Sequence, residues 1–500
     1  MQKSSKNILL VYPQHTKTFW GFENVMKVLG KKAAYPPLGI LTIASMLPDH
    51  WNKKLVDLNT DILNSADIIW ADFVFIGGMI VQKESVLKVI ERAQHLNKPV
   101  VAGGPLFTTG AEDFTFVDHL FLGEAEDTIR DFIKDVEENT LKKVYQATDF
   151  PDLSRVPVPD WSLINPFKYH SMSLQYSRGC PFNCEFCDIV VLNGRTPRTK
   201  TKEQVIAELD ALYKLGWHEA VFFVDDNLIG NKHKLKTEIL PAIIEWQKSK
   251  KYPFTLNTQV SINLTDDDEM INLMVEAGFN TVFIGIETPD EKSLEECAKF
   301  QNQNRDLVSG IKKLQNFGLE VQGGFIVGFD SDTPAIFQKQ IEFIQKSGIV
   351  TAMVGLLTAL PKTRLHERLE ENKRIVKESS ANNTIFSTLN FIPKMDKNIL
   401  FSGYTRILET IYNPKDYYER IKTFLREFKP VKKNISRKVI QKFELRAFFG
   451  SIWLLGIKGS GKVHFWNLLF WVLLKYPGLF HQAISSSLAG LHLRTVVSVS

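Results

Sequence analysis

Three of the four cysteines lie within one short segment, residues 177–188, which reads SRGCPFNCEFCD. Cys180, Cys184 and Cys187 have the spacing CxxxCxxC, and thiolates this close together on one loop can converge on a metal. Iron–sulfur clusters are the usual partners of tight cysteine groups, and a typical cluster takes four protein thiolates. A [4Fe–4S] cluster held by only three thiolates would leave one iron open, which suits chemistry better than plain electron transfer.

Other interpretations of these cysteines are weaker. A zinc site usually needs a second CxxC pair or a mixed set of Cys and His ligands, and the sequence has no second pair. Disulfides are disfavoured because there are so few cysteines in 500 residues without a signal peptide. Three incidental cysteines at this spacing would be an uncommon coincidence.

The CxxxCxxC spacing, with Phe186 directly before the last cysteine, resembles the signature of radical S-adenosylmethionine (SAM) enzymes. The resemblance implies a [4Fe–4S] cluster whose open iron is chelated by the amine and carboxylate of SAM. It also implies that an electron from the cluster splits the sulfonium, which leaves a 5′-deoxyadenosyl radical that abstracts hydrogen from a substrate. We expect an electron donor such as a flavodoxin or ferredoxin.

Composition is that of an ordinary globular protein of about two to four domains, with 44% apolar and 23% charged residues. The net charge of +5 is too small to argue for nucleic acid as a partner. The N-terminus, MQKSSKNILLVYP, lacks the long apolar core of a signal peptide.

The apolar stretch FWNLLFWVLL (465–474) is only about half as long as a membrane-spanning helix. A cytoplasmic location is expected, where reducing conditions would protect an exposed cluster.

The first predicted domain, residues 1–149, alternates apolar strands with helical patterns at 36–47 and 85–96, which indicates a doubly wound parallel sheet. The strands are expected at 7–13, 53–59, 72–80, 99–107 and 119–125. Three of them end in glycines or acids, namely Gly77, Gly78, Gly103, Gly104, Gly123 and Glu124. Because parallel sheets bind ligands outside the carboxyl ends of their strands, these residues predict one shared ligand surface, although any single pair could be a turn. The GxGxxG fingerprint is absent, so a dinucleotide site is unsupported.

The order PPLG, GG, AGGP and GEAE along this domain resembles the cobalamin-binding domain fused to many radical enzymes. The motif Asp-x-His-x-x-Gly, which supplies histidine to cobalt in some relatives, is absent. The resemblance therefore implies cobalamin bound without histidine ligation, and His95 and His119 are predicted to be surface or packing residues. Residues 150–167 hold four prolines and no periodic apolar face, which predicts a stiff linker.

Residues 168–371 repeat a strand–helix rhythm that matches a partial (β/α)6 barrel. The six strands are expected at 172–179, 220–227, 254–261, 281–288, 320–330 and 351–361. Two helix starts support the pattern: Thr201 with Gln204 forms a capping box, and Thr288-Pro289-Asp290-Glu291 combines a cap, a proline and acids. Because barrel chemistry occurs at the carboxyl ends of strands, the polar residues there are the candidate site.

These strand-end residues follow the cysteine loop around the predicted barrel. By likeness to the radical family, Asp225, Asp226 and Asn227 occupy the place that receives the methionyl amine of SAM. Thr258 and Gln259 could bond the ribose hydroxyls, although relatives often carry Glu at the position of Gln259. The remaining members of the predicted SAM site are Glu287, at the end of the fourth strand, and Gly324 and Gly328, which could lie against adenine. For any one of them, a polar strand end that meets water is an alternative.

Arg178, Arg195, Arg198 and Lys200 surround the cysteine loop with positive charge, which could stabilise an anionic cluster or guide a carboxylate. A solvated basic loop is the alternative. Cys297 lies on a predicted helix beside acidic residues and is expected to pack in the core, far from the other cysteines. A hydrogen donor to a substrate radical is the alternative role.

Residues 372–500 are expected to be a mainly helical domain. GIKGSGKV (456–463) nearly fits a P-loop, but Val463 replaces the required Ser or Thr and no buried strand precedes it, so nucleotide binding is rejected. The strongly basic segment 428–442 is followed by stretches rich in Trp, Phe and Leu. These features could place the region on an anionic membrane surface, and a helical domain that covers the barrel is the alternative.

The segments FVDDN, GIETPDEKSL, GGFIVGFDSD and AMVGLLTALPKT are similar to one branch of cobalamin-dependent radical enzymes with a C-terminal domain of unknown function. That branch includes hopanoid C-2 methylases. The resemblance implies that cobalamin delivers a methyl group to an unactivated carbon of a lipid-like or other small substrate, with two SAM molecules used per turnover. The alternatives are a cobalamin-dependent radical rearrangement without methyl transfer and a non-catalytic iron–sulfur redox protein.

Overall fold

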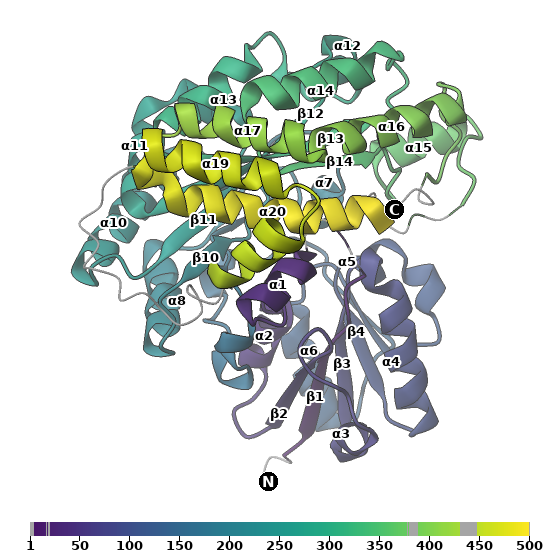
Figure 1. Cartoon of the computed structure of the whole chain (residues 1–500). Coiled ribbons are helices and arrows are strands. Elements are labelled where there is room, and N and C mark those ends of the chain that lie inside the picture. Colours follow the sequence, from purple (N-terminus) through teal and green to yellow (C-terminus); the bar gives the residue numbers. More distant parts are fainter. Residues whose placement is uncertain are drawn as a thin grey trace.

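The described residues form two six-stranded parallel sheets, a two-stranded sheet and a group of C-terminal helices (Figure 1). The computed structural model describes residues 5–16, 18, 21–377, 379, 389–430 and 448–499. In Figure 1 the first sheet (purple to blue) lies below the second (teal to green), and the last helices (yellow) lie beside the second sheet and reach α1. The chain is an α/β protein with a helical C-terminal region, as predicted.

The first sheet has the order β2-β1-β3-β4-β5-β6, and all its pairs are parallel. Successive residues of β1 are buried on opposite faces: Leu9 and Val11 join one apolar cluster, while Ile8 and Leu10 join another. Both faces are therefore covered by helices, which explains why β1 reads as a continuous apolar run. The strands are β1 Asn7–Tyr12, β2 Asn52–Asp57, β3 Phe73–Gly77, β4 Val100–Gly103, β5 His119–Leu122 and β6 Val144–Gln146. The helices are α1 Glu23–Leu29, α2 Leu38–Met46, α3 Ser65–Trp70, α4 Lys83–His95, α5 Pro105–Thr109 and α6 Thr128–Glu138.

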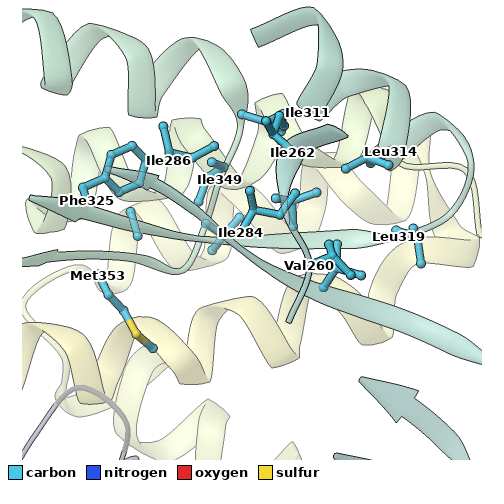
Figure 2. Packing of buried hydrophobic residues seen from close by; sticks show 14 of the residues in the cluster. Val260, Ile262, Ile284, Ile286, Ile311, Leu314, Leu319, Phe325, Ile349 and Met353 are labelled. Atoms are coloured by element: carbon cyan, nitrogen blue, oxygen red, sulfur yellow. The ribbon is translucent and has the colours of Figure 1, made fainter. Parts of the chain in front are cut away.

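The second sheet runs β7-β10-β11-β12-β13-β14, so neighbours in space follow chain order, as in a partial barrel. Its strands are β7 Met172–Leu174, β10 Ala220–Phe223, β11 Thr255–Gln259, β12 Phe279–Glu287, β13 Glu320–Val327 and β14 Ala352–Leu356. The main covering helices are α8 Lys202–Lys214, α10 Leu240–Ser249, α11 Asp268–Ala277, α13 Leu307–Asn316 and α14 Ala335–Ser347. Figure 2 shows the core between them, where Ile284 and Ile286 of β12 lie near Ile311 of α13. The predicted capping box of Thr201 and Gln204 begins α8.

The C-terminal helices pack against the barrel helices and against β14. They are α15 Arg364–Glu371, α16 Lys397–Tyr412, α17 Pro414–Glu427, the π-helix η12 Ile452–Lys458, α19 Lys462–Lys475 and α20 Phe480–Val499. The Tyr404 hydroxyl of α16 donates to the Val354 carbonyl of β14 at 3.1 Å, and the fully buried Arg420 of α17 donates to the Val350 carbonyl. Most of the basic segment 428–442 lies outside the described residues.

Several predicted boundaries were wrong. The predicted strand 99–107 ends at Gly103. Gly104 has a positive φ of +100°, and Pro105 begins α5, so the extended strand cannot continue. The predicted strand 172–179 divides into β7 and β8 (Ser177–Arg178), and β8 pairs with β9 (Arg198–Thr199) in antiparallel fashion. Sequence reasoning missed β6, a three-residue strand with two exposed residues.

The proline-rich segment 150–167 packs against both neighbouring units. It contains three short 3-10 turns, η4 Leu153–Arg155, η5 Trp161–Leu163 and most of η6 Pro166–Lys168. Leu153 and Trp161 are buried, and the Asp160 amide donates to the Leu41 carbonyl at 3.1 Å. The segment is therefore held in place along its length.

Candidate active site

The cysteine loop connects β8 to the short helix α7 (Ile189–Asn193) at the carboxyl end of the second sheet. Cys184 is buried, while Cys180 and Cys187 are half-buried, and all four cysteines of the chain are free. Burial raises the thiol pKa of Cys180 and Cys187, so a bound cation would be needed to hold them as thiolates. Among the described residues, no group of three or more His, Cys, Asp or Glu side chains is arranged so that it could hold a metal ion.

Two adjacent carboxylates at the end of β10 hold the backbone on either side of this loop. Asp226 accepts hydrogen bonds from the Gly179 amide and the Asn193 side chain, both at 2.9 Å. Asp225 is fully buried and accepts from the Tyr176 amide at 3.2 Å and from the Ser177 hydroxyl at 2.6 Å. Burial raises the pKa of Asp225 to about 7. Both carboxylates thus position the loop, and their contact with the methionyl amine stays a prediction.

The next predicted residues differ in where they face. Asn227 bridges to the turn after β11, since Ser261 donates its amide to Asn227 Oδ1 at 3.1 Å. The Thr258 hydroxyl donates to the Phe223 carbonyl at 3.0 Å and is 1% exposed, so it faces the helices with Leu256. Gln259 lies on the opposite face of the strand, together with Asn257, and is half-buried. Of the two predicted ribose ligands, Gln259 is therefore the better placed.

Glu287 occupies a strained position at the end of β12. Its φ is +63°, at a register shift between β12 and β13, and a bulge of this kind re-aims a side chain. Its carboxylate pairs with Lys299 at 2.8 Å, and both side chains are nearly buried. A Cβ on Gly285 would crowd the ends of both side chains, so this ion pair would have to shift if the glycine were replaced. Burial opposes the charge on Lys299, but Glu287, Cys184 and Cys187 outweigh burial and raise the lysine pKa.

Sequence reasoning missed Lys299 and Gln301, which lie beside the cysteine loop. The Gln301 amide donates to the Cys184 sulfur at 3.8 Å, and its Oε1 is buried with no hydrogen-bond partner among the described residues. Asn257 Oδ1 has the same character. The buried acceptor of Gln301, whose amide contacts the free thiol of Cys184, indicates a site that is completed by a ligand. The segment 297–302 contains no recognisable motif. The proximity of Lys299 and Gln301 to the cysteine loop is therefore evident only in the folded chain.

The predicted adenine-contacting glycines have structural roles in the strand end. A Cβ on Gly324 would come within 2.8 Å of the Phe283 ring, so this glycine makes room for that side chain. Gly328 has a φ of +109°, and its amide donates to Asp332 at 2.8 Å. Contact of either glycine with adenine stays a prediction.

An ion-pair network ties the cysteine loop to the C-terminal region. Glu185, next to Cys184, accepts two hydrogen bonds from Arg368 of α15, at 2.6 and 2.9 Å. Arg368 also pairs with Asp330 at 3.0 Å, and Asp330 pairs with Arg374 at 2.7 Å. The backbone of Glu185 is held as well, because its amide donates to the Cys297 carbonyl at 2.9 Å. Cys297 packs in the core as predicted, but the expectation that it lies far from the other cysteines was wrong.

We expect Arg368→Met to weaken iron binding by about tenfold, since supporting contacts of a metal site typically contribute this much to affinity. The substitution would leave Glu185 without its bidentate partner beside Cys184. Iron retention against a chelator measures the effect. Arg406→Met, which removes an exposed arginine of α16 that pairs with Gln338, is the matched control and should retain iron like the wild type. Equal iron retention in both variants would contradict the role of Arg368.

The glycines predicted to line a cobalamin surface lie at the carboxyl ends of three adjacent strands, β3, β4 and β5. The Gly78 amide donates to the Gly103 carbonyl at 3.1 Å, and a Cβ on Gly104 would lie only 3.0 Å from the Gly78 carbonyl oxygen. Gly123 has a φ of +84°, and its amide donates to the Thr108 hydroxyl. A Cβ on Gly77 would meet only Ile40, at 3.8 Å. A Cβ on Gly78 would lie 2.9 Å from Val86, and one on Gly103 would lie 3.2 Å from Phe121, so most of these glycines serve close packing within the domain, and their contact with cobalamin stays a prediction. His119 bonds the Lys142 carbonyl and packs against Phe132, as predicted.

Glu124, the last predicted member of this surface, instead joins the end of the first sheet to the two-stranded sheet β8–β9, which leads into the cysteine loop. Its carboxylate pairs with Arg178 at 2.6 Å and also with Arg198, while Glu126 pairs with Arg178 at 2.6 Å. The two carboxylate side chains are 8% exposed. Lys200 is likewise paired with the buried Glu208. Three of the four cations predicted around the cysteine loop are therefore already paired with carboxylates, which argues against a solvated basic loop, and of the four only Arg195 is exposed.

The residues present fit the cofactors that the motifs suggested. Three free thiols, one of them hydrogen-bonded by Gln301, match the ligand set of a cluster with one open iron. The glycines at the ends of β3, β4 and β5 add no side chains there, and Gly77, where an added Cβ would make only an ordinary contact with Ile40, is compatible with close approach of a large flat ligand. The contact of Glu124 with Arg178 brings that surface up to the cysteine loop.

Family models match three consecutive parts of the chain. They are a B12 binding domain over residues 28–133, the Radical SAM superfamily over 174–344, and a domain of unknown function (DUF4070) over 363–499. An uncharacterized methyltransferase of Synechocystis sp. is 39% identical, over 95% of this chain and 89% of the relative. The hopanoid C-2 methylase of Rhodopseudomonas palustris is 36% identical, over 93% of this chain and 89% of the relative. The chain belongs to the cobalamin-dependent radical SAM methyltransferase family. Its cofactors are a [4Fe–4S] cluster, SAM and cobalamin.

Solved structures share this arrangement of domains. The methyltransferase TsrM of Kitasatospora setae, with cobalamin and a [4Fe–4S] cluster bound, has a TM-score of 0.65 and covers 99% of this chain and 100% of its own, at 13% identity. The cobalamin-dependent radical enzyme OxsB has a TM-score of 0.64 and 16% identity, and covers 99% of this chain and 84% of its own. At these identities the likeness concerns the fold alone.

Proposed function

We propose that this enzyme transfers a methyl group to an unactivated carbon of a lipid-like substrate of the hopanoid type. The observation that carries the proposal is the 36% identity to a hopanoid C-2 methylase over 93% of this chain. The match includes the C-terminal region, which distinguishes this branch from radical enzymes that share only the barrel. The family requires a reductant, and we propose a flavodoxin or ferredoxin for that role.

The residues of the chain have separable tasks in this proposal. Cys180, Cys184 and Cys187 would hold the cluster, which together with SAM and cobalamin supplies radical formation and methyl transfer. Asp225 and Asp226 fix the loop that carries these cysteines. We propose that Gln259, on the face of β11 opposite Thr258, and Glu287, held by Lys299, bind SAM.

We further propose that cobalamin binds between the carboxyl ends of the two sheets and faces the cluster. Two contacts support this placement because they hold those ends together. Glu124, directly after the β5 end, pairs with Arg178 of β8. Lys362, after β14, donates to the carbonyl of Thr108 in α5 at 3.0 Å. A ligand in this position would be shielded from water by both domains.

A direct test is anaerobic incubation of the reconstituted enzyme with a lipid extract, a reductant and SAM deuterated in its methyl group. The proposal predicts a lipid product that carries the deuterated methyl group. A product of unchanged mass would indicate the radical rearrangement instead. Labelled product that appears only with a peptide or other water-soluble substrate would leave methyl transfer intact and overturn the lipid assignment.

A further inference from the structure

The outer surface of the C-terminal helices carries an apolar face that the described residues leave uncovered. Its six large side chains come from η12 and α19, and each is more than half exposed: Trp453, Ile457, Val463, Phe470, Leu473 and Leu474. We refer to these six residues as the apolar face. Leu474 is 85% exposed, a high value for a leucine in a helix that already has a packed side.

The helix α19 is apolar on two sides, and only one side is used for packing within the chain. Phe465, Leu468, Leu469 and Val472 are buried against neighbouring helices. The outer positions 463, 470, 473 and 474 recur at helical spacing on the other side. A helix that is apolar all round is normally buried, so the outer side is suited to a partner outside the chain.

The two elements of the apolar face are held in a fixed relation to each other. The Trp466 indole of α19 donates to the Gly456 carbonyl of η12 at 3.0 Å, and its ring lies 6.1 Å from that of Phe470. The aromatic side chains are therefore positioned before any partner arrives, which lowers the entropy cost of binding.

Positive charge accompanies the apolar face. The described residues 448–499 contain four Lys and Arg residues and no Asp or Glu, in a chain whose net charge is only +5. Lys458, Lys462 and Lys475 lie at the ends of η12 and α19, and all three are exposed. Tryptophan, large apolar side chains and flanking lysines are the combination found in helices that lie in the surface of anionic membranes.

We propose that the apolar face docks this enzyme on an anionic lipid bilayer, with η12 and α19 lying in the plane of the surface. With 14 residues, α19 is about 21 Å long, short of the roughly 30 Å of hydrocarbon in a bilayer. In the ranges that the structure describes, no helix is both long and apolar enough to cross a membrane. A second copy of the chain is a poorer occupant, because a twofold contact would bring the lysines of both copies together.

The docking proposal stands apart from methyl transfer, although it agrees with a lipid-like substrate. Flotation with vesicles tests it without any turnover. The wild type should bind vesicles of mixed phosphatidylglycerol and phosphatidylcholine, and bind pure phosphatidylcholine much more weakly. Phe470→Ser combined with Leu474→Ser should lower partitioning into the anionic vesicles by at least about tenfold, given the apolar area that each side chain would bury. Lys458→Gln combined with Lys462→Gln should weaken binding to the anionic vesicles by about fivefold per lysine. The same variant should bind pure phosphatidylcholine like the wild type.

The matched control is Ile62→Ser combined with Phe116→Ser, which removes two exposed apolar side chains from the N-terminal domain. This control should bind vesicles like the wild type. Circular dichroism should show native helix content in all variants, since the substituted residues are exposed. The proposal is overturned if the wild type ignores anionic vesicles or if the Phe470/Leu474 variant binds them unchanged. It is also overturned if that variant only converts a dimer to a monomer, without change in vesicle binding.

Discussion

Alanine at any one of Cys180, Cys184 or Cys187 is expected to abolish SAM cleavage and to leave the protein with little or no iron. The loop offers three thiols, so losing one leaves two ligands for a cluster that already lacks a fourth protein thiolate. Iron and sulfide analysis after anaerobic reconstitution measures the first effect. Production of 5′-deoxyadenosine from SAM in the presence of dithionite measures the second.

Cys297→Ala is the sharpest control for this prediction, because Cys297 is the fourth cysteine and its carbonyl accepts from Glu185 of the cysteine loop. Its thiol faces the Leu294 carbonyl at 3.6 Å within the core. We expect this variant to keep its iron and to cleave SAM, with at most a modest loss of stability from the small cavity. If Cys297→Ala loses the cluster as the loop variants do, a fourth thiolate fills the open iron and SAM cannot bind as described.

The second large effect is expected from Glu124→Gln, which should lower the free energy of unfolding by about 3 kcal/mol. Glu124 pairs with Arg178 and Arg198, and these side chains are between 8% and 17% exposed. Arg178 keeps Glu126 as a partner, but Arg198 would be left as a nearly buried, unpaired charge. Urea denaturation followed by two spectroscopic probes measures the loss, and separate transitions would reveal that the two sheets no longer unfold together.

Glu112→Gln is the matched control, since Glu112 is an exposed acid of the same domain. It should change stability by less than about 0.5 kcal/mol, as is usual for surface substitutions. Adding Arg198→Met to Glu124→Gln should recover part of the loss, because the unpaired charge is then removed. An unfolding free energy of Glu124→Gln equal to that of Glu112→Gln would show that this carboxylate does not stabilise the contact between the N-terminal domain and β8–β9.

The first sheet could be predicted because its central strands are continuous apolar runs, whereas strands of the second sheet such as β11 and β13 alternate in burial and were predicted from the repeated strand–helix pattern. In β1, Ile8, Leu9, Leu10 and Val11 are all fully buried, which is the condition that produces such a run. The exposed edge strand β6 gave no such signal, since only Tyr145 of its three residues is buried. The break between β7 and β8 could not be predicted either, because it depends on the pairing of β8 with the distant β9.

The cysteine loop was predictable because its spacing is local, and the residues around it were not. Glu185 and Arg368 are 183 positions apart, and Glu124 and Arg198 are 74 apart, so nothing in the sequence pairs them. Thr258 and Gln259 are neighbours in the sequence, but their side chains point to opposite faces of the sheet, because successive side chains alternate along β11. Lys299 and Gln301 follow a short helix and approach Cys184 only in the folded chain.

The most direct test of methyl transfer is the stoichiometry of the two products formed from SAM. If one SAM molecule provides the radical and a second provides the methyl group, 5′-deoxyadenosine and S-adenosylhomocysteine should form in equal amounts, each matching the methylated product. Quantification by mass spectrometry after a timed anaerobic reaction decides the question. Steady formation of 5′-deoxyadenosine with substrate consumed, and no S-adenosylhomocysteine, would contradict the account.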